Sequence, residues 1–508
     1  MSTQGARPAE DNRRRLRRVN TAAAAGLVLA VGAVASGQRL PLLVFPFLAL
    51  VTCVTLTARR LFRWETMVAL LAAVIFLIPI KRYVTPGASF NLEPYRIYVA
   101  FLAGAWFGAL MVDPRIRLRR TGLEGPVGMF VFAMLASVAA NDGRIRELGI
   151  QKDVVKTLTF FGSFLIILFL VVSVARTYID IHRVVHTVVV CATTVAFFGL
   201  IESRTHFNIF NHLHPLLPGL QFQDPAYTAG LTPAYLSRSG VERIYASSAH
   251  PIELSAVLVM VIPLAVYLKR VTGQRRWIIA ALLLALATLA TLSRTGFLMM
   301  LVTLLVFLWL RPVETRRLWP WVVPVVLACA IVVPHTLTSL YDAFFPKGGL
   351  IAQQDQRNVG SQDGGRLTDI GPSLREYEQH PLLGEGFGTR ISQRLGVLEG
   401  RVGAATARIL DDQWLGSLLE TGAIGFLSLV WLFVRPIRRL ARRAKADSGP
   451  EGWLAAALAA SLTSFAISML TFDAFGFVQV TILTFLLLAL SSSLLKLPAT
   501  AAPPAARR

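Results

Sequence analysis

The sequence predicts an all-α, polytopic integral membrane protein. Of its 508 residues, 54% are hydrophobic and only 16% are charged, and the mean hydropathy is +0.57. A soluble protein of this length does not need so apolar a composition. Apolar runs also recur from end to end, each close to the roughly 20 residues that a helix needs to cross the bilayer core. We therefore expect about 12–14 transmembrane helices.

The first part of the chain is a basic segment followed by closely spaced apolar runs. Residues 1–20 are polar and basic, and the first run lacks a clear small-residue cleavage site, so we expect a retained anchor and not a cleaved signal peptide. Residues 21–201 are predicted to hold transmembrane helices 1–7. Their expected spans are 21–37, 41–57, 66–80, 97–112, 126–140, 158–175 and 183–201.

A first long polar segment, 202–250, separates these runs from the next group. It is rich in proline and irregular, which is typical of a lid or of the wall of a cleft. It also contains His206, His212 and His214. No carboxylate or cysteine pattern completes a metal site with these histidines, so a metal is not expected here.

Residues 251–337 are predicted to hold transmembrane helices 8–11. The expected spans are 251–268, 277–293, 296–310 and 320–337. The middle two are joined by almost no loop, which predicts a tight helical hairpin with Arg294 at its tip.

The second long polar segment, 338–413, is too long to be a bare connection. Leu367, Ile370, Leu374 and Tyr377 recur at helical spacing and predict an amphipathic helix over 366–379 at the membrane surface. The helix is expected to end at His380-Pro381. The glycine-rich GEGFG that follows is typical of a turn, although its backbone N–H groups could also face an anion.

Residues 414–494 are predicted to hold transmembrane helices 12–14, with spans 414–434, 453–471 and 476–494. The Pro/Ala-rich end, 495–508, is expected to be a disordered cytoplasmic tail. All three cysteines, Cys53, Cys191 and Cys329, fall within apolar spans, where we expect them to pack and not to bind metal or form disulfides.

The formal net charge of +22 is explained by the location of the basic residues. With a cytoplasmic N-terminus and alternating spans, most lysines and arginines fall in short loops on one face, which is the positive-inside bias. Anionic membrane lipids are therefore the expected partners of these loops. Nucleic-acid binding is not expected, because the basic runs are short, scattered and without interleaved aromatics. Both long polar segments then fall outside the cytoplasm.

Three arginines are candidates for an anion site on the outer face. Arg243 precedes the span that starts at His250-Pro251, Arg294 lies at the hairpin, and Arg366 opens the amphipathic helix. A guanidinium at a membrane interface can be an anchor that snorkels to water. It can also bind phosphate with two parallel hydrogen bonds. The spacing alone leaves both interpretations open.

Carboxylates cluster where the second polar segment meets the next span. Asp411 and Asp412 end the segment, and Glu420 lies about two turns into the helix. One aspartate at a helix start is ordinarily an N-cap. Two adjacent carboxylates and a buried glutamate exceed what a cap needs, so one of them is a candidate general base.

The segments LSRTGFL, GRLTDIGPSLREYEQHPLLGEGFG and DDQWLGSLLETGAIGFL, in this order and spacing, resemble the O-antigen ligase and Wzy-type polymerase superfamily. The resemblance covers roughly residues 240 to 435, and the first seven spans carry no signature. It implies a metal-independent, inverting glycosyltransferase without a cofactor, in the bacterial cytoplasmic (inner) membrane with both termini cytoplasmic. The donor would be a glycan on undecaprenyl diphosphate, and the acceptor another sugar, at the outer face.

The resemblance also implies roles for individual residues. Arg243, Arg294 and Arg366 match arginines that bind the donor diphosphate. Where the family usually has a catalytic histidine, this sequence has Asp411 followed by Asp412, which favours a polymerase over a ligase.

Three further residues, His380, Glu420 and Ser293, are expected to support the site. His380 belongs to the turn pattern of the family and is not favoured as the base. The resemblance further implies a flippase and a chain-length regulator as partners.

Two functions of other classes remain as alternatives. A transporter or flippase of lipid-linked glycans should carry charges within several spans, facing a cavity. This chain keeps its charges almost entirely in loops and span ends, which disfavours transport. A membrane scaffold without catalytic activity is the other alternative.

Overall fold

The computed structural model describes residues 63–86, 92–114, 116–224, 237–238, 241–316, 370–390 and 410–498. The chain divides into two units, Met1–Thr66 and Met67–Arg508, and the second contains nearly every described residue. In chain order the elements are α3 (Trp64–Leu77), β1 (Tyr83–Val84), α4 (Pro94–Val112), α5 (Glu124–Ala140), α6 (Asp142–Glu147), α7 (Gln151–Val174), α8 (Tyr178–Thr205), η1 (Ile209–His212), η2 (His214–Leu216), β2 (Gln221–Phe222), β3 (Ser237–Arg238), β4 (Val241–Glu242), α11 (Pro251–Thr272), α12 (Arg276–Ala290), α13 (Arg294–Leu310), α14 (Pro312–Arg316), α18 (Ile370–Tyr377), α20 (Gln413–Ala446), α21 (Pro450–Ser468) and α22 (Val478–Leu494).

The predicted all-α, multi-pass fold is confirmed. Six described helices, α4, α7, α8, α11, α20 and α21, are long and apolar enough to cross a membrane, and α3, α5, α12, α13 and α22 are shorter apolar helices. Each of them overlaps one expected span. The other expected spans, 21–37, 41–57 and 320–337, lie outside the described residues.

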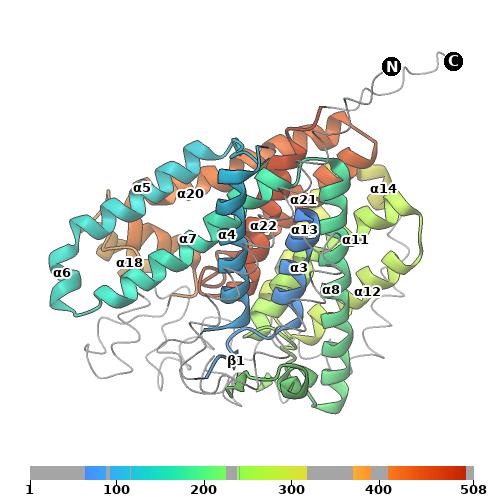
Figure 1. The fold of residues 1–508 in the computed structure, drawn as a ribbon, viewed down its shortest axis with the longest axis horizontal. Coiled ribbons are helices and arrows are strands. Elements are labelled where there is room, and N and C mark those ends of the chain that lie inside the picture. The colour runs from blue at the N-terminus through green and yellow to red at the C-terminus, as the bar shows by residue number, and fades with distance from the viewer. Residues whose placement is uncertain are drawn as a thin grey trace, which may run out of the picture. The chain divides into compact units, whose positions relative to one another are not determined.

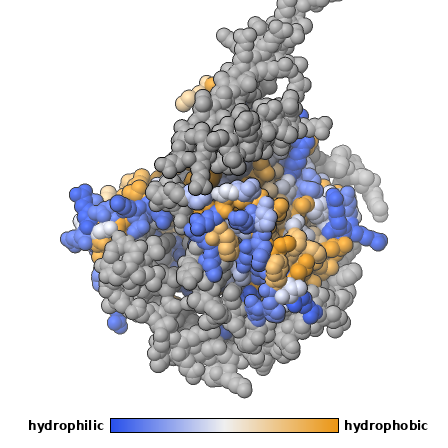
Figure 2. Space-filling model, turned by 60° about the horizontal axis from the view of Figure 1, so that its bottom comes forward, coloured by the Kyte–Doolittle hydropathy of each residue, from blue (hydrophilic) through white to orange (hydrophobic). Residues whose placement is uncertain are grey.

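The apolar side chains divide between a buried core and a surface suited to lipid. Helices α11, α21 and α22 are buried along most of their length, and α11 packs against α12, α13 and α21 (Figure 1). Helices α5, α8 and α13 expose large apolar side chains such as Phe132, Phe197 and Trp309. Hydrophilic residues gather at the left edge of Figure 2, where α6 lies in Figure 1.

The expected hairpin at Arg294 is present. Helix α12 ends at Ala290 and α13 begins at Arg294. The turn requires a left-handed backbone at Leu292, with φ of 49°. The Ser293 hydroxyl caps α13 by accepting a hydrogen bond from Gly296 N–H at 3.3 Å.

Helix α20 is broken where it passes Gly422. This residue has φ of 63° and ψ of −169°, a conformation open to glycine because it lacks a Cβ. The break leaves carbonyl groups before it and N–H groups after it without helical partners. Inside a membrane protein such groups must be satisfied internally, because lipid offers no hydrogen bonds.

The segment 381–386 satisfies these groups on both sides of the break. Glu385 N–H donates to the Leu419 carbonyl at 2.9 Å, and Gly386 N–H donates to the Glu420 carbonyl at 3.3 Å. On the other side, Ala423 N–H donates to the Pro381 carbonyl at 2.9 Å. The glycine-rich turn is therefore a structural insert that completes α20.

We expect Gly422→Ala to destabilise the protein by at least about 2 kcal/mol. A Cβ there would lie 2.2 Å from the Leu382 carbonyl group, in a backbone conformation that alanine disfavours. Thermal unfolding of the detergent-solubilised protein measures the effect.

Gly416→Ala, in the same helix, is the matched control, because nothing lies within 4 Å of an added Cβ. It should leave the unfolding temperature unchanged or raise it, since alanine favours the helix. Equal behaviour of the two variants would contradict the inserted-turn account of the break.

Candidate functional site

The structure brings Arg243 to the hairpin that carries Arg294. Arg243 is buried, and its Nε donates to the Thr291 carbonyl at 2.9 Å. Arg294 is half-buried at the first position of α13. Two of the three predicted arginines therefore meet at the same hairpin, although they are about fifty residues apart in sequence. The third, Arg366, lies outside the described residues.

The same hairpin contacts the connection between α21 and α22. The hydroxyl groups of Thr295 and Thr471 lie 2.9 Å apart. Thr471 belongs to the short segment 469–477, which contacts both the hairpin and the start of α20.

The start of α20 is held by that segment through Gln413. Gln413 N–H donates to the Met469 carbonyl at 2.8 Å, and the Gln413 side-chain oxygen accepts from Phe475 N–H at 2.7 Å. The contacts thus run from Arg243 through the hairpin and 469–477 to the helix start that follows Asp411 and Asp412.

The two predicted aspartates have different surroundings in the structure. Asp412 is the N-cap of α20, and its carboxylate accepts from Leu415 N–H at 3.0 Å. Asp411 is exposed immediately before the cap. Capping therefore accounts for Asp412 but not for Asp411.

Asp473 is a carboxylate that the sequence reasoning missed. It lies half-buried in the 469–477 segment, two residues from Thr471 and two from Phe475. The available signal was a lone aspartate in a very short connection between two spans, a pattern that is too common to single it out.

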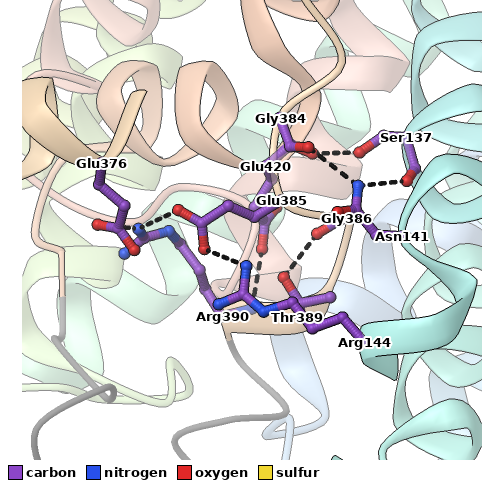
Figure 3. A network of polar contacts seen from close by, with 10 residues as sticks. All are labelled: Ser137, Asn141, Arg144, Glu376, Gly384, Glu385, Gly386, Thr389, Arg390 and Glu420. Atoms are coloured by element: carbon purple, nitrogen blue, oxygen red, sulfur yellow. Dashed lines mark hydrogen bonds and ion pairs between the residues drawn. The ribbon is translucent and has the colours of Figure 1, made fainter. Parts of the chain in front are cut away.

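Glu420 and the glycine-rich segment form a polar network against α5 and α6 (Figure 3). Glu420 is buried, and its carboxylate accepts from Arg390 N–H at 3.4 Å. Its carbonyl accepts from the Ser137 hydroxyl at 2.5 Å. The Asn141 side-chain amide donates to the Gly384 carbonyl at 2.9 Å.

Ion pairs connect this network to α18, the described part of the predicted amphipathic helix. Arg390 contacts Glu376 of α18 at 2.6 Å and Glu385 at 3.4 Å, and Arg144 contacts the other Glu385 oxygen at 3.3 Å. Burial raises the pKa of Glu385, nearby Glu376 adds to the rise, and the two arginines oppose it. The network fixes α18 relative to α20.

Three N–H groups of GEGFG, those of Gly384, Glu385 and Gly386, donate to carbonyl groups of the protein, so the alternative that they face an anion does not hold for them. Glu385 and Gly386 both donate to carbonyls of α20, so neither N–H faces a ligand. His380 is exposed at the start of this turn, and its carbonyl accepts from Gly384 N–H at 2.9 Å.

The histidines of the first polar segment have local partners. His206 pairs with Glu242, and His212 contacts the Asn208 carbonyl at 3.0 Å. Within the part of the chain that the structure describes, no three His, Cys, Asp or Glu side chains are grouped to hold a metal ion. Cys191 is buried in α8, whereas Cys53 and Cys329 lie outside the described residues.

Comparison with protein families gives a match to part of the chain. Residues 279–430 match the model of the O-Antigen ligase family. No curated protein matches the chain. The matched region contains Arg294, Asp411 and Asp412. It excludes Arg243, which contacts the hairpin of Arg294, and Asp473, whose segment 469–477 contacts the same hairpin.

Proposed function

We propose that this multi-pass membrane protein, whose residues 279–430 form an O-antigen ligase domain, is a glycosyltransferase of surface polysaccharide assembly. It transfers a glycan from undecaprenyl diphosphate to an acceptor sugar at the outer face of the bacterial cytoplasmic membrane. The observation that carries the proposal is the contact between Arg243 and the hairpin of Arg294. Through segment 469–477, this pair is connected to the helix start that follows Asp411.

Arg243 and Arg294 are assigned to the donor diphosphate. A guanidinium presents two parallel N–H groups that match phosphate oxygens, and it stays protonated at any physiological pH. Negative charge grows on the diphosphate as its bond to the sugar breaks, so these arginines stabilise the transition state without a metal ion. Arg366 would add a third guanidinium from the segment before α18.

Asp411 is assigned as the general base. It accepts the proton of the acceptor hydroxyl, whose oxygen then attacks the anomeric carbon of the donor sugar. The bond from that carbon to the diphosphate oxygen breaks, and the electron pair leaves with the lipid diphosphate. Attack from the face opposite the leaving group inverts the anomeric configuration. Asp412 holds the helix start in place by capping α20.

The buried carboxylates of the described spans support a transferase over a flippase. Glu202 is in the last turn of α8, Glu253 in the first turn of α11, and Glu420 eight residues into α20. Each accepts backbone N–H groups nearby. They serve structure near helix ends and do not line a pathway through the membrane.

We expect Arg294→Ala to reduce glycan transfer in proteoliposomes by at least about 100-fold. Arg294→Lys should lose less, because lysine keeps the charge but not the paired donors. Transfer rates measured with a carrier-linked oligosaccharide test this. Wild-type rates in both variants would remove Arg294 from the diphosphate site.

We expect Asp411→Asn to slow turnover by about 100-fold or more while donor binding stays near normal. Asp412→Asn is the matched comparison, because asparagine also caps a helix well and should keep the fold. Single-turnover rates and donor affinity are measured for both. Normal turnover in both variants would contradict a carboxylate base at this position.

Deletion of the gene distinguishes the two transfer reactions. Because aspartates stand where the ligase resemblance expects a histidine, we favour a polymerase, with transfer of finished polymer to a final acceptor as the second candidate. Surface glycan analysis after deletion should then show single repeat units. Long polymer left on the lipid carrier would instead establish the ligase reaction.

A further inference from the structure

The segment RIYASSAH, residues 243–250, is buried although it forms neither helix nor strand. Every residue from Arg243 to Ala249 is buried. Buried backbone N–H and C=O groups need hydrogen-bond partners, and a segment outside regular structure takes many of them from side chains. Two charged side chains from the N-terminal half of the chain bind four of these backbone groups.

The first is Arg82, in the connection between α3 and α4. Its side chain is 1% exposed. It donates to the Ala246 carbonyl at 2.7 Å and to the Ser248 carbonyl, and its guanidinium lies 4.5 Å from the ring centroid of Tyr245. Burial lowers the pKa of Arg82 to about 10, which leaves it protonated near neutral pH.

The second is Glu202, in the last turn of α8. Its two carboxylate oxygens accept from Tyr245 N–H at 3.2 Å and from Ala246 N–H at 2.9 Å. The two side chains therefore bind the same residue, Ala246, with Arg82 on its carbonyl and Glu202 on its N–H group.

The backbone conformation of Ala246 indicates that it needs the hydrogen bonds from Arg82 and Glu202. Its φ is 43°, in the left-handed region that alanine disfavours. Such a conformation persists only when surrounding contacts impose it. The turn at Ala246 sets the path of the chain from Arg243, which contacts Thr291, to the start of α11.

We infer that Arg82 and Glu202 are positioning residues, which together hold segment 243–250 so that Arg243 stays at the Arg294 hairpin. Arg82 does not contact substrate itself, because it is buried and donates to backbone carbonyls. Both residues lie outside the region that matches the O-antigen ligase family, so the N-terminal half would build part of the site. An effect of Arg82 and Glu202 on catalysis rests on the proposed function. Their role in fixing segment 243–250 does not.

Hydrogen exchange tests the hold without any substrate. In the detergent-solubilised protein, amides of 244–249 should exchange at least about tenfold faster in Arg82→Gln than in wild type, because a buried charge-assisted hydrogen bond is lost. Arg96→Gln is the matched control, since Arg96 of α4 pairs with Glu93, the residue that precedes this helix. Unchanged exchange in Arg82→Gln, or equal acceleration in both variants, would overturn the inference.

Two more variants keep the test decisive if Arg82→Gln does not fold. Glu202→Gln keeps the size of the side chain and removes its charge, so the same amides should exchange faster. Ala246→Gly, added to either variant, should restore part of the protection, because glycine adopts a positive φ without strain. Protection that stays at the wild-type level in Glu202→Gln would contradict the inference.

A double-mutant cycle tests whether the hold acts through Arg243. Alone, Arg82→Gln should raise the KM for the lipid-linked donor about tenfold with little change in the KM for the acceptor. In an Arg243→Ala background it should have no further effect. If the effects of Arg82→Gln and Arg243→Ala on the donor KM were fully additive, Arg82 would not act through Arg243. If Arg243→Ala alone were fully active, the diphosphate assignment would fail while the exchange result still stood.

Discussion

The break of α20 at Gly422, completed by the backbone of 381–386, is the constraint on which the end of the molecule that holds Asp411 depends. A spanning helix cannot leave carbonyl and N–H groups unpaired in lipid. The inserted turn pairs them, so the first part of α20 and the glycine-rich segment form one piece. Arg390 and Glu385 then connect this piece to α18. The position of the α20 start, and with it that of Asp411, follows from that arrangement.

Parts of the chain that are far apart in sequence meet at this end. Arg243 contacts the hairpin from segment 243–250, which Arg82 and Glu202 hold. Segment 469–477 connects the hairpin with Gln413. The family match covers the hairpin and the start of α20, whereas the side chains that hold Arg243 come from the unmatched half. A site made in this way needs both halves of the chain.

Among the described residues, hydropathy was sufficient to predict where the apolar helices lie and where α12 turns into α13, because both depend on local composition. The break at Gly422 could not be predicted, since TGAIG looks like any glycine-containing helix until the inserted turn is seen. The use of the Glu385 and Gly386 N–H groups by α20 could not be predicted for the same reason. The distinction between Asp411 and Asp412 required the cap geometry. Arg82 carried no signal, because its partners, which are backbone carbonyls, the Asn211 side chain and the Tyr245 ring, are all distant in sequence.

The central claim is that this protein cleaves the bond between a glycan and a lipid diphosphate and passes the glycan to another sugar. The most direct measurement is the release of free undecaprenyl diphosphate by the purified protein in proteoliposomes that contain the carrier-linked glycan and EDTA. We expect one carrier to be released for each glycan transferred. Carrier-linked glycan that changes leaflet but stays intact, or release that requires an added metal ion, would contradict the claim.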